Sequence, residues 1–231
     1  RKETNVRNFA GCGGAPETIP VGAGFNGGYA GRNMEEVKHH IEELAALGIP
    51  SPRNVPVLYP LSNHLVSQGN EVEIPHINCS GEAEWALVVG NDPQDIFIIA
   101  ASDHTDRALE VHGIAWSKQS FPNFLAKEAW LYSDIEKEFD EFVMRSWVER
   151  EGTDSLAQNG QLSRLLPPRY WISRLDEAQL LRPGTVLLGG TISMNPGVNP
   201  SGEKWRVEIE DQRGNISRVE YTIKLLPVAW E

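Results

Sequence analysis

The stretch GEAEWALVVG, residues 81–90, places two carboxylates, Glu82 and Glu84, at the head of an apolar, β-prone run. Alternate residues of a strand share a face, so both carboxylates are expected to point to the same side of the sheet. A second β-prone run at residues 96–101 follows a short turn and leads to Asp103. An antiparallel hairpin would return Asp103 to the neighbourhood of the glutamates, and the strand register, which sequence leaves open, decides whether it faces them.

Three converging carboxylates repel one another and raise each other's pKa unless a cation neutralises them. Because no Cys and no evident His joins Glu82, Glu84 and Asp103, the ligand set is all oxygen. Such a set favours a hard divalent cation, Mg²⁺ first, with Mn²⁺ or Ca²⁺ as substitutes. The alternative is that the glutamates are solvated residues at a strand end and Asp103 is a loop acid, since E-x-E alone is a weak motif.

The composition predicts one β-rich domain over residues 1–231, because 21 Gly and 15 Pro separate many short apolar runs. Residues 1–31 are expected to form strands and turns, and residues 33–48 a helix that Asn33 caps and Gly48 ends. The other predicted elements are helices at 133–147 and 168–180, a turn at Asn159-Gly160, and strands at 55–59, 71–74, 85–89, 96–101, 185–192, 205–210 and 216–226.

Charge and cysteine content exclude several classes of protein. The formal net charge of −11 is spread along the chain, which gives no electrostatic basis for binding nucleic acid or an anionic membrane. Cys12 and Cys79 are too few for a disulfide framework or a thiolate metal site. No run is long and apolar enough to cross a bilayer, and no secretory pattern is present. We therefore expect a cytoplasmic protein, with a mitochondrial location as the alternative because the sequence begins at Arg1.

The order of several motifs resembles that of the fumarylacetoacetate hydrolase superfamily. The matching segments are HIEEL at 40–44, EAE at 82–84, SDHTDR at 102–107, SKQSF at 117–121 and RPGTVLLGGT at 182–191. Three departures indicate a divergent branch without a known function. The gap between the acidic motifs is short, Thr185 stands where Asp is common, and Ile192 replaces a Pro. These departures leave the substrate more open than the fold.

The resemblance implies an α+β fold, a mixed β-roll or β-sandwich with flanking helices. It also implies Mg²⁺ or Mn²⁺ held by Glu82, Glu84 and Asp103, a small-molecule carboxylate substrate and a homodimer. Members act mostly on 2-oxo acids, so we predict a Mg²⁺-dependent C–C hydrolase of an acylpyruvate-like substrate. Decarboxylation, hydration or keto–enol tautomerisation of a 2-oxo dicarboxylate is the alternative, and a non-catalytic metabolite-binding protein is an alternative of another class.

The predicted helix over 33–48 suggests which histidine acts. Its apolar residues form one stripe: Met34, Val37, Ile41, Leu44 and Leu47. At about 100° per residue, His40 lies about 60° and Glu43 about 120° from the centre of that stripe, against about 160° for His39. His40 and Glu43 thus border the expected packed face and are neighbours suited to water activation. The alternatives are a half-buried histidine in a routine ion pair, or a mobile lid helix.

Two basic residues are candidates for contacts with substrate. Lys118 has apolar and aromatic neighbours that would desolvate its ammonium group, which favours a role in holding an enolate; a surface lysine is the alternative. Arg107 is expected to bind a metal-bound or substrate carboxylate, unless it forms a structural ion pair with Asp106 or Glu110.

Thr191 follows two glycines, of which Gly190 is the second. The glycines let backbone approach closely, and Thr191 resembles the superfamily's threonine that binds the substrate carboxylate. Gly190 is expected to contribute to the same substrate site. The alternative is a simple turn at a strand end.

Overall fold

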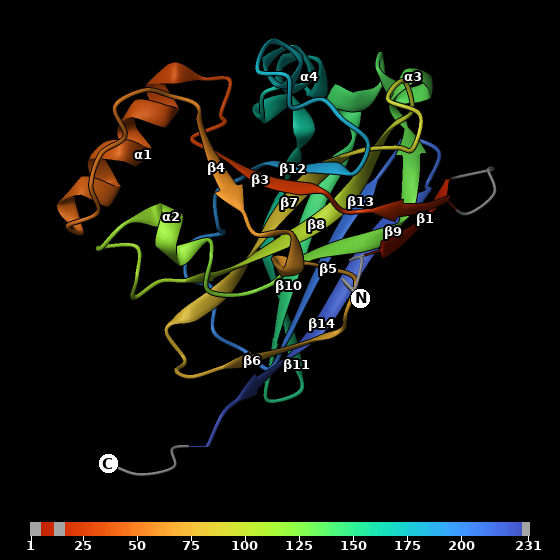
Figure 1. Ribbon diagram of the computed structural model, residues 1–231. Coiled ribbons are helices and arrows are strands. Elements are labelled where there is room, and N and C mark those ends of the chain that lie inside the picture. The colour runs from red at the N-terminus through yellow and green to blue at the C-terminus, as the bar shows by residue number, and fades with distance from the viewer. Residues whose placement is uncertain (1–5, 12–16, 228–231) are drawn as a thin grey trace.

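The computed structural model describes residues 6–11 and 17–227 and contains two β-sheets that pack face to face (Figure 1). The nine-stranded sheet has the order β2-β1-β9-β8-β7-β12-β3-β4, with β5 paired to β9. Its strands are β1 Val6–Gly11, β2 Glu17–Pro20, β3 Ala23–Gly28, β4 Val57–Leu61, β5 Val66–Ser67, β7 Cys79–Val89, β8 Ile96–Asp106, β9 Asn123–Leu131 and β12 Thr185–Thr191. Residues 1–5 and 12–16, and with them Cys12, lie outside the described part of the chain.

The second sheet has five strands in the order β11-β10-β13-β14-β6. They are β6 Glu71–Ile74, β10 Val143–Arg150, β11 Thr153–Gln161, β13 Lys204–Glu210 and β14 Ile216–Leu225. The helices are α1 Met34–Ala46, α2 Ile114–Ser117, α3 Tyr132–Ile135 and α4 Pro168–Glu177, with 3₁₀ turns at Asn63–Leu65, Phe139–Glu141 and Leu162–Arg164. The strand-rich α+β class predicted from the sequence is confirmed.

Aromatic side chains fill the core between the sheets. Phe124 of β9 stacks on Tyr221 of β14, with ring centroids 4.0 Å apart, and both rings are buried. Trp205 of β13 packs so closely against β7 that a Cβ on Gly81 would lie 2.4 Å from its indole nitrogen. Gly81 therefore lets the second sheet approach β7 at the residue that precedes the acidic pair.

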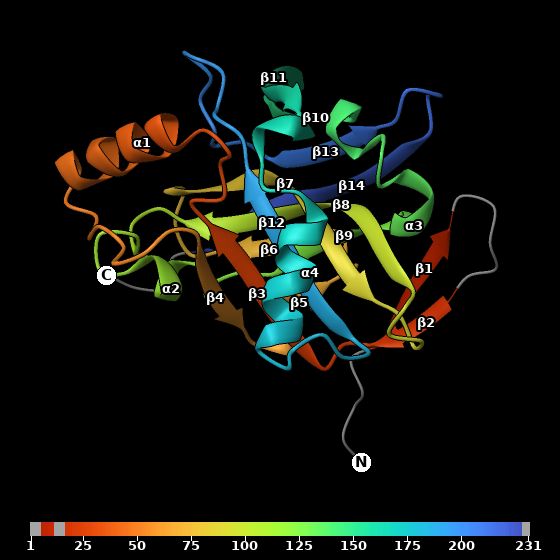
Figure 2. The ribbon, with the colours of Figure 1, turned by 90° about the horizontal axis from the view of Figure 1, so that it is seen from above.

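Helix α4 covers the larger sheet, and α1 lies beside α2 at one side of the molecule (Figure 2). The N-terminus of α1 is capped as expected, since Asn33 accepts hydrogen bonds from the backbone N–H groups of Glu35 and Glu36, at 3.1 and 3.5 Å. The expected packing of its apolar stripe is wrong: Val37 is buried, but Met34 is 57% exposed and Leu47 is 70% exposed. The reason is that α1 lies at the periphery and presents most of its surface to solvent.

The helix predicted over 133–147 is also wrong. Helix α3 has four residues, and Val143 begins strand β10, in which Met144, Ser146 and Val148 point inward. The predicted turn at Asn159-Gly160 lies inside β11, and the chain reverses instead between β10 and β11, where Glu151 and Gly152 have positive φ angles of 51° and 73°. Pairing with neighbouring strands prevails here over local helical periodicity.

The remaining expectations are met to within a few residues. Helix α4 begins at Pro168 as predicted, and β6 has the predicted bounds. Strands β7 and β8 extend beyond the predicted runs, so that they include the acidic residues themselves. Among the described residues, no helix combines the length and the apolar character needed to cross a membrane.

Candidate active site

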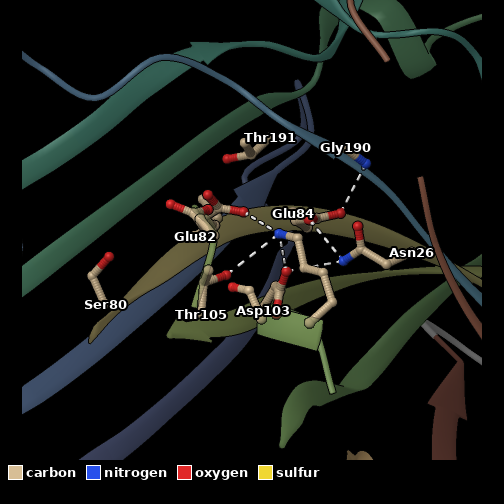
Figure 3. A network of polar contacts seen from close by, with 12 residues as sticks. Asn26, Ser80, Glu82, Glu84, Asp103, Thr105, Gly190 and Thr191 are labelled. Atoms are coloured by element: carbon tan, nitrogen blue, oxygen red, sulfur yellow. Dashed lines mark hydrogen bonds and ion pairs between the residues drawn. The ribbon is translucent and has the colours of Figure 1, made fainter. Parts of the chain in front are cut away.

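The antiparallel hairpin of β7 and β8 brings the three candidate carboxylates together. Its register places Asp103 directly opposite Glu82, with Glu84 two residues along the same face. One carboxylate oxygen from each residue lies within 4.8 Å of the others (Figure 3). Glu84 and Asp103 are buried, and the Glu82 side chain is 14% exposed. The cluster therefore forms a shared, nearly dry acidic site.

Lys118 follows α2 and places its ammonium group among these carboxylates. Its Nζ lies 2.8 Å from Glu82 Oε2, donates a short hydrogen bond to Asp103 Oδ2, and lies 3.3 Å from Thr105 Oγ1. Burial alone would lower the pKa of Lys118, but the neighbouring carboxylates outweigh burial and raise it above its usual range. The side chain is 7% exposed, so it is a buried cation and not a surface lysine.

Arg107 holds Glu82 from the other side. Its Nη1 lies 2.8 Å from Glu82 Oε1 and 3.0 Å from Glu110 Oε1, and its Nε donates to Ser80 Oγ at 2.9 Å. The ion pair with Glu110 is thus present, whereas Asp106 pairs with His76 at 3.2 Å. These contacts give Arg107 a clear part in orienting Glu82, and a direct contact with substrate stays a prediction.

The three carboxylates differ in acidity. Burial raises the pKa of Glu82, but Lys118 and Arg107 more than offset it and lower that pKa to about 2. Burial raises the pKa of Glu84 well above its ordinary value, and the nearby charges of Asp103 and Glu82 raise it further. The pKa of Asp103 is raised in the same way, by burial first and then by Glu82. The positive charge near Glu84 and Asp103 is thus too small to offset the cost of burying their ionised carboxylates.

The charge balance fits a divalent cation. With every group counted as ionised, the four carboxylates of Glu82, Glu84, Asp103 and Glu110 contribute a formal −4, and Lys118 and Arg107 contribute +2, which leaves a formal charge of −2. In addition, Asp103 Oδ1 is buried and has no hydrogen-bond partner among the described residues. A buried anionic oxygen is costly without a partner, and hard divalent cations prefer such oxygens. The residues present therefore fit a metal ion.

Asn26 of β3 belongs to the site but carries no signal in the sequence. Its Nδ2 lies 3.0 Å from Asp103 Oδ2 and 3.3 Å from Glu84 Oε1, and the residue is 1% exposed. Strand β3 reaches this position because it pairs in parallel with β12, with Leu188 opposite Asn26. A single Asn in a Gly-rich run does not predict such contacts, because they depend on the strand order.

Replacing Asn26 with alanine is expected to weaken Mg²⁺ binding by about 10- to 100-fold, the range for partners that orient metal-binding carboxylates. The change removes two hydrogen bonds that aim Glu84 and Asp103 at a common point. Isothermal titration calorimetry with Mg²⁺ measures the effect. Asn195→Ala is the control, since Asn195 donates to the Leu156 carbonyl on the surface. Equal Mg²⁺ affinities of the two variants would show that Asn26 does not orient the metal-binding carboxylates.

Gly190 and Thr191 lie at the end of β12, with Thr191 opposite Glu84. The Gly190 N–H donates to Glu84 Oε2 at 2.8 Å, and its φ of +110° is a conformation that L side chains rarely adopt. The Thr191 hydroxyl accepts a hydrogen bond from Gln158 at 2.9 Å. Gly190 thus contacts a candidate metal ligand, whereas a contact of Thr191 with substrate stays a prediction.

His40 and Glu43 are not brought to the cluster. Their side chains are each 59% exposed on α1, with His40 Nδ1 3.7 Å from Glu43 Oε2, and His39 Nε2 lies closer to Glu43, at 3.3 Å. The expectation that His40 borders a packed face is therefore wrong. Within the described chain, neither residue makes a hydrogen bond or ion pair to the three carboxylates. The imidazole of His40 instead faces the ring of Tyr29, at a centroid distance of 6.2 Å.

His104 lies next to Asp103 but points to the opposite face of β8. It is buried against Phe121 and Tyr221, and its Nδ1 lies 3.1 Å from the Tyr221 hydroxyl. Burial lowers the pKa of His104 to about 3, so the imidazole is neutral. It contributes to the core between the sheets and not to the acidic site.

Comparisons with solved structures identify the fold. A protein assigned as a fumarylpyruvate hydrolase from Burkholderia cenocepacia superposes with a TM-score of 0.67 at 16% identity, over 98% of this chain and 94% of that one. The 5-carboxymethyl-2-hydroxymuconate delta-isomerase from Mycobacterium smegmatis gives 0.58 at 20% identity, over 91% and 81%. A 2-keto-3-deoxy-D-arabinonate dehydratase complexed with magnesium and 2,5-dioxopentanoate gives 0.63 at 15% identity, over 92% and 77%.

These neighbours confirm, at the level of the fold, the resemblance to the fumarylacetoacetate hydrolase superfamily. A comparison with curated proteins gives no significant match. A family model described as "Protein of unknown function (DUF2848)" matches residues 27–221, which include the candidate residues named above except Asn26, one residue before the match begins. The chain therefore belongs to the DUF2848 family and has the fold of the fumarylacetoacetate hydrolase superfamily.

Proposed function

We propose that the protein is a Mg²⁺-dependent hydrolase that cleaves a C–C bond of a 2-oxo acid, with an acylpyruvate-like compound as substrate. The observation that carries the proposal is the buried cluster of Glu82, Glu84 and Asp103, which holds a carboxylate oxygen without a hydrogen-bond partner among the described residues. Together with Glu110, Lys118 and Arg107, the cluster has a formal charge of −2. Mn²⁺ is the nearest substitute for Mg²⁺ in an all-oxygen site, and Ca²⁺ is a possible replacement.

The fold neighbours support an enzymatic function, since they include an isomerase, a dehydratase and an assigned hydrolase. One of them is complexed with magnesium and a dioxo acid. Identities of 15–20% relate the folds and not the reactions, so the reaction is argued from the site.

When bound, a divalent cation supplies Lewis-acid stabilisation of an oxo group and of the carboxylate beside it. The protein's own cation is Lys118, which stays protonated because its pKa is raised, and which we place next to the oxygen that becomes negative. Thr191 donates a hydrogen bond to the substrate carboxylate, with Gly190 shaping the backbone beside it. Arg107 holds Glu82 in place through its 2.8 Å contact.

His40 and Glu43 are the proposed water-activating pair. Both are exposed on α1 and make no contact with the carboxylates, so this role requires α1 to approach the site when substrate binds. The absence of such a contact among the described residues also favours a second candidate, decarboxylation or keto–enol tautomerisation. These reactions proceed from an enolate held by Lys118 without any attacking water.

Turnover of oxaloacetate and acylpyruvates with Mg²⁺ in ¹⁸O-labelled water distinguishes the reactions. Hydrolysis is expected to place ¹⁸O in the cleaved acid, whereas an unlabelled acid product rules hydrolysis out. A His40→Ala variant should lose hydrolysis but keep any tautomerisation. If no compound reacts and Glu84→Gln binds oxalate as well as wild type does, the function is metabolite binding without catalysis. The homodimer and the cytoplasmic location stay predictions.

A further inference from the structure

Gln158 of β11 links the acidic strand to Thr191. The residue is 1% exposed and its amide makes four hydrogen bonds. The oxygen accepts from the Ala83 N–H and from Ser146 Oγ, both at 2.8 Å. The nitrogen donates to the Ile192 carbonyl at 2.6 Å and to Thr191 Oγ1 at 2.9 Å. Every donor and acceptor of the amide is therefore used.

Two of these partners determine which way the amide faces. The backbone N–H of Ala83 can only donate, and the backbone carbonyl of Ile192 can only accept. The amide oxygen must therefore face Ala83, and the amide nitrogen must face Ile192 and Thr191. If the amide were flipped by 180°, its nitrogen would face the Ala83 N–H and its oxygen the Ile192 carbonyl, and neither backbone group would have a hydrogen bond to it.

The orientation of the amide in turn determines the role of the Thr191 hydroxyl. Because Gln158 donates to it, Thr191 Oγ1 is an acceptor in that contact and keeps its own hydrogen for another partner. Its other contact is to the Ile192 carbonyl at 3.4 Å, beyond the usual range of about 2.5–3.0 Å for O–H···O bonds. The hydroxyl is thus prepared to donate to an acceptor-only group such as a carboxylate.

Gln158 also lies against the acidic strand itself. Ala83, whose N–H it accepts, lies between Glu82 and Glu84, and Thr191 is opposite Glu84 in the sheet. The buried Gln158 amide therefore bridges Ala83 of β7 and Thr191 of β12. Thr191 is half-buried and lies opposite Glu84 in the sheet (Figure 3).

We propose that Gln158 is a positioning residue that makes Thr191 a hydrogen-bond donor to the ionised carboxylate of the substrate. This rests on the proposed function, in which that carboxylate lies beside Thr191. Gln158 touches no reacting atom. It favours anionic, acceptor-only groups at this end of the site, because the Thr191 hydrogen is left for the ligand while one of the two acceptor lone pairs of the hydroxyl is already used by Gln158.

Gln158→Glu tests the proposal, with oxalate as the probe in saturating Mg²⁺. A glutamate retains an oxygen for Ala83 and Ser146, but its second oxygen takes the Thr191 hydrogen and faces the Ile192 carbonyl. Calorimetry should show oxalate bound about tenfold more weakly or worse, the effect of losing a charge-assisted hydrogen bond. Ser146→Ala, which leaves the Thr191 contact intact, should bind oxalate as wild type does. Mg²⁺ affinity without oxalate should be the same in Ser146→Ala as in wild type, and no weaker in Gln158→Glu, because the added carboxylate makes the site more negative.

A double-mutant cycle separates positioning from added negative charge. In a Thr191→Val background, Gln158→Glu should cause no further loss of oxalate affinity, since the hydroxyl it acts through is gone. If circular dichroism shows that the glutamate variant is unfolded, Gln158→Met replaces it in the same cycle. An equal loss in both backgrounds, or no loss, overturns the inference. Wild-type protein that binds Mg²⁺ but not oxalate overturns the proposed function and the inference with it.

Discussion

Replacing Lys118 with methionine is expected to destabilise the protein in EDTA by about 3–5 kcal/mol, the usual cost of removing one partner from a buried ion pair. The Lys118 side chain is 7% exposed and its ammonium group contacts both Glu82 and Asp103. Its loss leaves Asp103 without its cationic partner and Glu82 paired with Arg107 alone. Urea denaturation measures the free energy of unfolding. The same variant is expected to lose turnover of any 2-oxo acid that the wild type converts.

Mg²⁺ should restore much of this loss. Without Lys118 the formal charge of the site falls from −2 to −3, so the cation stabilises the folded state of the variant more than that of the wild type. Lys224→Met is the matched control: Lys224 pairs with Glu73 at 2.9 Å on the surface, and its loss should change the free energy of unfolding much less than the loss of Lys118 does. If both variants lose the same stability in EDTA, Lys118 does not neutralise the cluster.

Asp103→Asn is expected to weaken Mg²⁺ binding by more than about 100-fold, beyond the range for residues that act through a ligand. Asp103 Oδ1 is buried without a partner, and the substitution replaces an anionic oxygen of the cluster by a neutral amide of the same shape. Isothermal titration calorimetry measures the affinity. Circular dichroism shows whether the variant remains folded.

The control for this variant lies on the same strand. Asp106 is three residues further along β8, points to the other face and pairs with His76. Asp106→Asn should therefore bind Mg²⁺ as the wild type does. An equal loss of affinity in both variants would indicate a general electrostatic effect and not a site at Asp103. A wild-type protein that binds no divalent cation would remove the metal from the proposed chemistry.

Local signals in the sequence were sufficient for several elements. Asn33 caps α1 as expected, and the β-prone runs on either side of the turn at residues 91–95 form the β7–β8 hairpin. These features depend on neighbouring residues, whose capping and turn preferences act whatever the rest of the chain does. For the same reason the ends of α1 were predictable although the surface that it buries was not.

The segment from 133 to 150 shows where local signals fail. Its apolar residues fit a helical period as well as a strand period, and the helix prediction was wrong. Strand β10 forms because β13 pairs along it, with Met144 opposite Ile209. The paired residues of these two strands lie between 55 residues apart, Glu149 to Lys204, and 67 residues apart, Val143 to Glu210, so periodicity within the segment did not contain the answer.

The sequence by itself determined that Glu82 and Glu84 share one face of a strand, because alternate residues of a strand point to the same side. Only the tertiary structure decided that Asp103 is opposite Glu82, that Lys118 enters the cluster, and that Asn26 and Gln158 hold it. Asn26 meets Glu84 across 58 residues of chain and Asp103 across 77. Such contacts depend on strand order and register, because a shift of one residue turns every side chain of a strand to the opposite face.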